Sequence, residues 1–179
     1  MRATVDLAQE QGYAKLSIEA VAARAGVGKH TIYRRWPSKA MLFRDSLLTL
    51  RPPVPDFPDT GDIVADLRRR MHATVDLMAV EPWGPLFRAL VGEIQHDPEV
   101  AASLAERFFR PQAERTVARL RQAREQGQIA EDLDLDLAQA ILAGPVYYRL
   151  LISGEPVTHD HVDRLLHTLF AGMAPRPPA

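Results

Sequence analysis

The residues best suited to binding a partner molecule lie between positions 29 and 39, where cationic, imidazole and hydroxyl side chains follow one another closely. Ile32 is the single aliphatic residue among the first seven. On a helix it would face inward and leave nearly all the others exposed. Lysine and arginine bind phosphate oxygens or guanine edges, and hydroxyl groups bind phosphate oxygens. The polar set comprises Lys29, His30, Thr31, Tyr33, Arg34, Arg35 and Lys39.

Two interpretations of this segment are open from the residues alone. It has the composition of a recognition helix for nucleic acid, with Lys29 and His30 at the start, where side chains reach base edges. Alternatively, Tyr33 is a packing residue and the arginines form a solvated face. For Trp36, core packing is the favoured role.

The sequence on both sides predicts the elements that would hold this segment. Ser17 is an expected N-cap, followed by apolar residues at helical spacing. Gly26 suits the left-handed end of that helix, and Val27 is expected as a buried turn residue. Ser38 caps a further helix after the segment. The spacing predicts a helix-turn-helix followed at once by a third helix. Ser17 and Lys39, at two helix N-termini, are therefore also placed to bind phosphate.

Composition excludes several classes of protein. The chain has 179 residues and no cysteine, which rules out disulfides, thiolate zinc sites and cysteine nucleophiles. The longest uncharged stretch has 12 residues, Leu137 to Tyr148, below the roughly 18 that suggest a membrane span. The first residues lack the apolar core of a signal peptide, so we expect no membrane association and a cytoplasmic location.

Charge is distributed unevenly along the chain. Residues 1–50 contain eight basic and four acidic residues, whereas the remainder contains 14 basic and 19 acidic residues. A basic head on an acidic body is expected if only the head binds nucleic acid. A difference of this size also arises easily by chance in 50 residues.

Helical periodicity continues through the rest of the chain and predicts an all-α fold. A stretch with four prolines, Arg51 to Gly61, reads as a linker. We therefore expect an N-terminal helix-turn-helix domain (1–50), a linker (51–61), a helical ligand-binding and dimerisation domain (62–174) and a tail (175–179). Within the second domain, Pro111 should kink or split a long helix near Phe108.

Several blocks in the first quarter of the chain resemble the N-terminal domain of the tetracycline-repressor (TetR) family. They are Gly12-Tyr13, Leu16-Ser17-Ile18, Val21-Ala22, Ala25-Gly26-Val27, Thr31-Ile32-Tyr33, Trp36-Pro37-Ser38-Lys39 and Leu42. The resemblance implies a dimeric regulator of transcription, a repressor that a small-molecule effector releases from a double-stranded DNA operator. We expect no catalytic activity, no cofactor and no metal, since the sequence has no glycine-rich phosphate loop and no activated-serine motif. Family members usually begin with a basic arm and a full first helix, whereas this sequence opens partway along that helix. Two interpretations are open: the start is truncated or misassigned, or the first helix is shortened.

Two further sets of residues are expected to serve the second domain. An apolar or aromatic effector would contact bulky side chains around a central cavity, namely Met71, Val75, Met78, Trp83, Phe87, Phe108 and Tyr147. For each of these residues, ordinary core packing is the alternative. The last two helices are expected to pair with those of a second copy in a four-helix interface. The strongest apolar stripe there comprises Val162, Leu165, Leu166, Leu169 and Phe170, continuing to Met173.

Four alternatives remain open. Asp132, Asp134 and Asp136 alternate like a calcium loop, although a polar helix start fits them better. The histidines of 159–167 with Asp160 and Asp163 could form a metal site, but a solvated helix face fits them better. The whole chain could also be a helical small-molecule-binding protein or enzyme without DNA function, or a regulator that binds a protein partner.

Overall fold

The computed structural model describes residues 1–53 and 55–171, and these residues form helices without any strand. The predicted all-α fold is therefore confirmed. The chain separates into two compact units. Unit 1 comprises Met1–Pro53 and Leu77–Phe109, and unit 2 comprises Val54–Asp76 and Arg110–Ala179. Met173 and the predicted tail lie outside the described residues.

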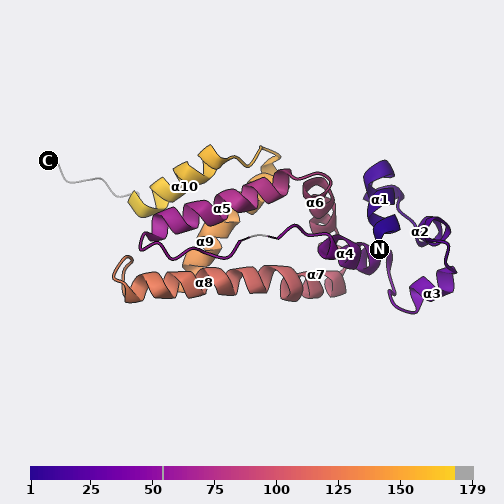
Figure 1. Ribbon diagram of the computed structural model, residues 1–179, viewed down its shortest axis with the longest axis horizontal. Helices are drawn as coiled ribbons and strands as arrows, with labels where there is room; N and C mark the ends of the chain where they lie inside the picture. Colours follow the sequence, from indigo (N-terminus) through magenta and orange to yellow (C-terminus); the bar gives the residue numbers. More distant parts are fainter. Residues whose placement is uncertain (54, 172–179) are drawn as a thin grey trace. The chain divides into compact units, whose positions relative to one another are not determined.

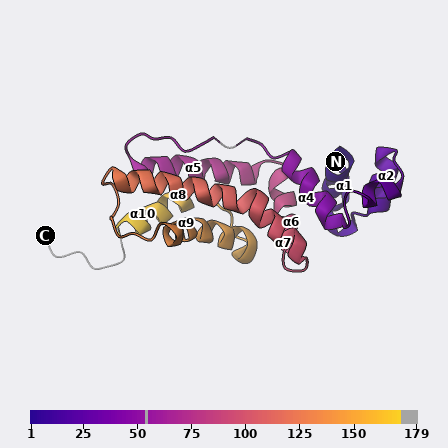
Figure 2. The same cartoon turned by 90° about the horizontal axis from the view of Figure 1, so that it is seen from below.

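Unit 1 is built from short helices around a core that includes Phe43, which is completely buried. Its helices are labelled in Figure 1, and all of them except α3 are labelled again in Figure 2. They are α1 (Arg2–Gln11), α2 (Ile18–Ala25), α3 (Lys29–Tyr33), α4 (Lys39–Thr49), α6 (Trp83–Glu93) and α7 (Pro98–Leu104), with a 3-10 turn at Tyr13–Lys15 and a π turn, η2, at Ala105–Phe109. Helix α4 packs against α1, α6 and α7. The residues after the linker therefore form part of the same unit as the helix-turn-helix.

Unit 2 is a bundle of longer helices. It contains most of α5 (Ile63–Ala79), together with α8 (Arg110–Glu125), α9 (Leu135–Tyr148), the π turn η3 (Arg149–Ser153) and α10 (His159–Ala171). Helix α10 lies along α5 (Figure 1), and Arg68 of α5 donates to Asp163 of α10 at 3.0 Å. The core of the unit comprises Ile63, Leu67, Val75, Leu120, Ala123, Leu135, Leu142, Val162 and Leu166.

Local side-chain chemistry explains where the helices begin and end. The Ser17 hydroxyl accepts the backbone N–H of Ala20 at 3.1 Å, and the Ser38 hydroxyl accepts that of Met41 at 3.2 Å. Gly26 ends α2 in the left-handed conformation, with φ 67°, which a side chain with a Cβ would disfavour. These three predictions are confirmed. The prediction for Val27 is wrong: the residue is 43% exposed, in the turn that follows the left-handed Gly26.

Proline disturbs the long helix after Asp97 as predicted. The π turn Ala105–Phe109 separates α7 from α8 and immediately precedes Arg110-Pro111. Pro111 has no N–H to offer the carbonyl four residues back, and a widened turn accommodates its ring. The split therefore falls at Phe108, and it turns that side chain into the core of unit 1, where it is 1% exposed.

Candidate functional site

Helix α3 presents the polar side chains through a single apolar anchor. Ile32 is 5% exposed and packs α3 onto the rest of unit 1. The helix spans only Lys29–Tyr33, but the backbone N–H of Trp36 still bonds to the carbonyl of Ile32 at 2.9 Å. The helical course therefore continues past the formal end of α3. Six side chains are exposed on it: Lys29, His30, Thr31, Tyr33, Arg34 and Arg35.

This face can bind a polyanion. Lys29, Arg34 and Arg35 carry positive charge, and no ion pair occupies them among the described residues. Thr31 and Tyr33 add hydroxyl groups. The combination suits phosphate contacts and the hydrogen-bonding edges of guanine. Sequence reasoning predicted each of these residues, and the structure brings all of them together on one short element.

Lys39 and Ser17, predicted as phosphate ligands, are more constrained than the residues of α3. The Lys39 ammonium donates to the Tyr13 carbonyl at 3.3 Å and lies 4.4 Å from the centre of the Tyr13 ring. Its other N–H groups stay available for a phosphate. The Ser17 oxygen caps α2, so only its O–H remains to donate.

Trp36 connects the recognition segment to α4. Its indole Nε1–H donates to Asp45 Oδ2 at 3.0 Å, while the Arg35 guanidinium lies 4.8 Å from the centre of its ring. Asp45 Oδ1 accepts from Arg44 Nε at 2.9 Å and pairs with Arg107 of the π turn η2. Burial alone would raise the pKa of Asp45, but hydrogen bonds from Trp36, Arg44 and Arg107 outweigh it and lower that pKa.

Tyr13 makes a second connection of this kind. Its hydroxyl donates to Glu93 Oε2 of α6 at 2.9 Å, and its ring stacks at an angle on Phe43 with centroids 4.7 Å apart. Burial, and then the negative charge of Glu93, raise the pKa of the Tyr13 phenol well above its ordinary value. Tyr13 therefore stays neutral and acts as a donor throughout the physiological range.

Sequence reasoning did not identify Asp45, Glu93 or Arg107. Asp45 and Arg107 are 62 positions apart, and Tyr13 and Glu93 are 80 apart. No periodicity connects residues at such distances. The only local signal was Asp45 itself, the one acidic residue of α4 in a basic segment.

The seven residues predicted to line an effector cavity are divided between the two units. Trp83, Phe87 and Phe108 stack on one another in unit 1, with the rings of Phe87 and Phe108 4.8 Å apart. Met78 is buried in the same unit, whereas Met71, Val75 and Tyr147 belong to unit 2. Trp83 is 2% exposed, and its indole nitrogen finds no hydrogen-bond partner among the described residues. A buried donor of this kind calls for a partner.

Unit 2 contains a hollow of about 660 Å³ on a different set of residues. Its floor is formed by core residues such as Leu67, Leu120 and Leu142, and exposed apolar side chains of α9 and α10 form its rim. The lining comprises Leu67, Leu120, Gln128, Ile129, Ala130, Asp132, Leu133, Asp134, Leu137, Ala138, Ile141, Leu142, Leu169 and Phe170. None of the seven predicted residues is among them.

The stripe predicted to pair with a second copy is divided between the core of unit 2 and its surface, where Leu169 and Phe170 are 36% and 43% exposed. Val162 and Leu166 have no exposed surface and belong to the core of unit 2. Leu165 is half-buried, and Leu169 and Phe170 line the hollow. Helix α9 and the following turn instead expose an apolar stripe. It comprises Leu137, Ile141, Tyr148 and Ile152, of which Ile152 is 72% exposed.

Other groups that could hold a metal are accounted for by structure. Among the described residues no cluster of three or more histidine or acidic side chains has the geometry of a metal site. Asp134 caps α9, accepting from the N–H groups of Asp136 and Leu137. His159 pairs with Asp76 at 2.8 Å instead of joining His161. Within residues 1–53 and 55–171, no helix combines the length and apolarity needed to cross a bilayer.

Comparison with known proteins gives concordant results for both ends of the chain. Residues 1–45 match the family model of bacterial regulatory proteins, tetR family, and residues 57–169 match the tetracyclin repressor-like C-terminal domain. The chain is 32% identical to the HTH-type transcriptional regulator YdeS of Bacillus subtilis, over 97% of this chain and 87% of that protein. It is 29% identical to the DNA-binding transcriptional repressor TetR of Mycobacteroides abscessus, over 87% of this chain and 81% of that one. The crystal structure of the TetR family transcription regulator SCO0332 superimposes with a TM-score of 0.74 at 36% identity, covering 97% of this chain and 95% of the other.

Proposed function

The chain belongs to the TetR family of DNA-binding transcriptional regulators, and from that premise we propose that it is a repressor that binds its operator through α3. The observation that carries the proposal is the exposed polar face of α3, anchored by Ile32. Lys29 and His30 read base edges, Arg34 and Arg35 bind phosphate or guanine, and Thr31 and Tyr33 bind phosphate. Lys39 and Ser17 add phosphate contacts at the N-termini of α4 and α2. The protein acts in the cytoplasm and carries out no catalysis.

Selection from a pool of random duplexes tests this proposal. The wild-type protein is expected to enrich one sequence with two half-sites about one helical turn apart or somewhat more. Arg35→Ala and Lys39→Ala are each expected to weaken binding to that duplex. Each phosphate contact that is lost should also reduce the slope of the logarithm of the binding constant against the logarithm of the salt concentration by about one. Arg121→Ala, an exposed arginine of α8, serves as the matched control. Failure to enrich any sequence would instead favour a helical small-molecule-binding protein without DNA function.

The functional form is a homodimer whose interface includes the outer stripe of α9 and η3. The support is the exposure of Leu137, Ile141, Tyr148 and Ile152 at helical spacing, since such stripes mark protein contacts. Leu165 of α10 extends it. Replacing Ile152 by Arg is expected to give a monomer in light scattering, whereas Gln122→Arg on the exposed face of α8 leaves the dimer intact. A wild-type monomer at micromolar concentration would contradict the interface.

The effector is an apolar or aromatic small molecule that binds in the hollow of unit 2. The volume of about 660 Å³ lies in the range of about 300–1,000 Å³ common for such sites. The unpartnered indole N–H of Trp83 supports the sequence-predicted set as the second candidate. In that set Trp83 would donate to an acceptor on the effector, against the rings of Phe87 and Phe108.

Two variants distinguish the candidate effector sites, with the neutral dye N-phenylnaphthylamine as the probe. Ala138→Phe puts a ring into the hollow, while Trp83→Phe removes only the indole donor from unit 1. If the hollow is the site, Ala138→Phe abolishes the rise in dye fluorescence and Trp83→Phe preserves it. The reverse pattern would transfer the site to the predicted residues of unit 1.

A further inference from the structure

An unbroken chain of side chains runs from the recognition segment to the π turn within unit 1. The Arg35 guanidinium lies over the Trp36 ring at 4.8 Å, and the Trp36 indole donates to Asp45 at 3.0 Å. Asp45 in turn pairs with Arg107 of η2. Arg35 is a proposed DNA contact, and Arg107 lies three residues before the start of α8.

Asp45 is the centre of this chain and uses both oxygens. Oδ2 accepts the indole N–H of Trp36, and Oδ1 accepts from Arg44 and Arg107. The carboxylate side chain is 20% exposed and that of Arg44 is 8% exposed, so Arg44 holds the carboxylate from the protein side. Arg107 is 48% exposed and approaches from outside α4. Arg107 is therefore the more exposed of the two arginines that pair with this carboxylate.

The orientation of Trp36 depends on this carboxylate. Pro37 restricts the backbone of Trp36, and the indole N–H is directed by its bond to Asp45. The ring plane then limits where the Arg35 guanidinium can lie, because a guanidinium over an aromatic face is stabilised only within a narrow range of positions. A change at Asp45 is therefore transmitted to Arg35 through the ring of Trp36.

We propose that Asp45 is a positioning residue for operator reading, which fixes Arg35 through Trp36 and is itself adjusted by Arg107. The inference rests on the proposed function of α3 and adds a control on the recognition segment. When Arg107 is paired, Asp45 is held on two sides and Trp36 keeps one orientation. When η2 moves Arg107 away, the Trp36 bond loosens, and Arg35 loses its defined position against the bases.

Arg107→Gln is the test variant, because an exposed residue can be changed without threatening the fold. Arg110→Gln, three positions later and also exposed, removes the same charge without touching Asp45. Trp36→Phe keeps an aromatic ring under Arg35 and removes only the indole donor. Together with the double variant Trp36→Phe/Arg107→Gln, they form a cycle that separates transmission from mere loss of charge.

Spectroscopy gives a first readout that needs no DNA. The chain has two tryptophans, Trp36 and Trp83, so a ¹⁵N spectrum contains two indole signals, and Trp36→Phe identifies one of them. Arg107→Gln is expected to shift the Trp36 signal and leave that of Trp83 unchanged, whereas Arg110→Gln shifts neither. An unmoved Trp36 signal in Arg107→Gln would overturn the proposal.

Binding to the selected duplex and to a scrambled duplex gives the second readout. Arg107→Gln is expected to weaken binding to the selected duplex by about two- to fivefold, as for a partly exposed ion pair, with little change on scrambled DNA. In the Trp36→Phe background it should have no further effect. Equal losses on both duplexes, or additive losses in the cycle, would overturn the relay. If the wild type itself does not distinguish the duplexes, the proposed function fails and the relay fails with it.

Discussion

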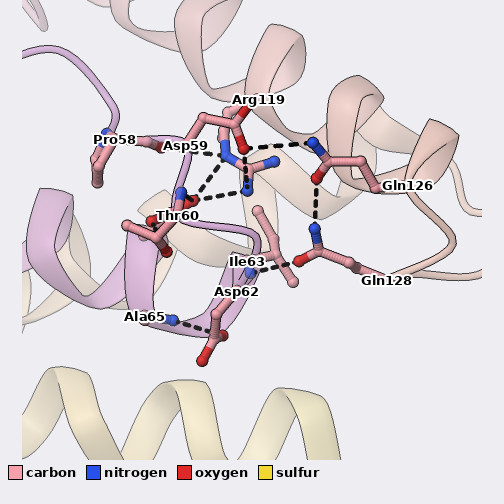
Figure 3. A network of polar contacts seen from close by, with 10 residues as sticks. Pro58, Asp59, Thr60, Asp62, Ile63, Ala65, Arg119, Gln126 and Gln128 are labelled. Atoms are coloured by element: carbon pink, nitrogen blue, oxygen red, sulfur yellow. Dashed lines mark hydrogen bonds and ion pairs between the residues drawn. The ribbon is translucent and has the colours of Figure 1, made fainter.

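Replacing Asp66 by Asn is expected to destabilise unit 2 strongly, because it removes the counter-charge of a buried arginine. Asp66 has no exposed surface, and Arg119 is 2% exposed. The carboxylate accepts from Arg119 Nε at 2.9 Å and Nη2 at 2.6 Å, and from the Thr60 N–H at 3.2 Å and hydroxyl at 2.7 Å. Figure 3 shows Arg119 in this network with Pro58, Asp59 and Thr60 of the linker.

The size of the effect follows from what remains around Arg119. In Asp66→Asn the guanidinium retains the Pro58 carbonyl at 3.3 Å and the half-exposed Asp59 at 3.5 Å. Breaking a buried pair by removing one partner costs about 3–5 kcal/mol. With a urea m-value of about 2 kcal/mol/M, the midpoint of unfolding should fall by about 2 M. The loss is a large share of the roughly 5–15 kcal/mol that stabilises an ordinary domain.

Urea unfolding followed by far-ultraviolet circular dichroism measures this loss. Both tryptophans, Trp36 and Trp83, belong to unit 1. Their fluorescence therefore reports the unfolding of unit 1 separately from that of unit 2. The apolar double replacement Asp66→Leu/Arg119→Met is the control, since replacing a buried pair by apolar residues is often neutral or stabilising. A midpoint shift below about 0.5 M in Asp66→Asn, or a double variant less stable than the single one, would refute the reasoning.

The same pair predicts how acid acts on unit 2. Burial would raise the pKa of Asp66, but hydrogen bonds from Thr60 and Arg119 outweigh it and lower that pKa. A carboxyl whose folded pKa is depressed stabilises the fold above its unfolded pKa of about 3.9 and loses that contribution as pH falls through the folded pKa. Asp66→Asn should therefore lack this part of the acid-induced loss.

Three further predictions concern single sites. The raised pKa of Tyr13, caused by burial and by Glu93, means that Tyr13→Phe should match the wild type in tyrosinate absorbance gained up to about pH 11. The stability gained from the bond to Glu93 should be fully present below the unfolded pKa of about 10 and be lost as pH rises from there through the folded pKa. Burial, and then the positive charges of Arg149 and Arg164, lower the pKa of His161. The free energy of unfolding should therefore fall as pH drops below about 6.5. His161→Phe should reduce this pH dependence in thermal unfolding. A Cβ on Gly84 would lie 1.9 Å from the carbonyl oxygen of Met78. Gly84→Ala should therefore lower the free energy of unfolding by about 1–3 kcal/mol or more, measured by urea unfolding followed by tryptophan fluorescence. An unchanged midpoint would contradict the close approach.

The features that the sequence predicted correctly depend on neighbours within one or two helical turns. The hydroxyls of Ser17 and Ser38 accept N–H groups three residues ahead. Gly26 adopts the left-handed conformation, which depends only on the residue itself and the helix end it follows. Pro111 disturbs the helix through its own missing N–H. The polar face of α3 was predictable for the same reason, since five residues with one apolar side chain among them specify which side is buried.

The features that escaped prediction depend on which distant residues meet. The apolar stripe of α10 was visible, but a stripe alone does not say whether a helix of the same chain or of another covers it. Val162 and Leu166 are covered within unit 2. The stripe exposed on α9 was less conspicuous because Gly144 and Pro145 interrupt it. Arg107 lies 62 positions from Asp45, and Asp66 lies 53 positions from Arg119, beyond any sequence period.

In our proposal, an effector bound in unit 2 acts on α3 along the chain, because the chain itself connects the two units. The chain passes between the units at three places: after Pro53, after Asp76 and after Phe109. The first passage is the proline-rich linker. Its C-terminal end is fixed by Thr60, whose N–H and hydroxyl donate to Asp66. The second passage lies within α5, and the third joins the π turn η2 directly to α8. Arg107 of η2 pairs with Asp45 of α4, so this passage leads directly to the carboxylate that binds Trp36. We therefore propose that an effector acts through the third passage and alters the hydrogen bond that the Trp36 indole donates to Asp45. That route requires that the π turn η2 adopt two arrangements. π turns inside helices are frequent at functional sites.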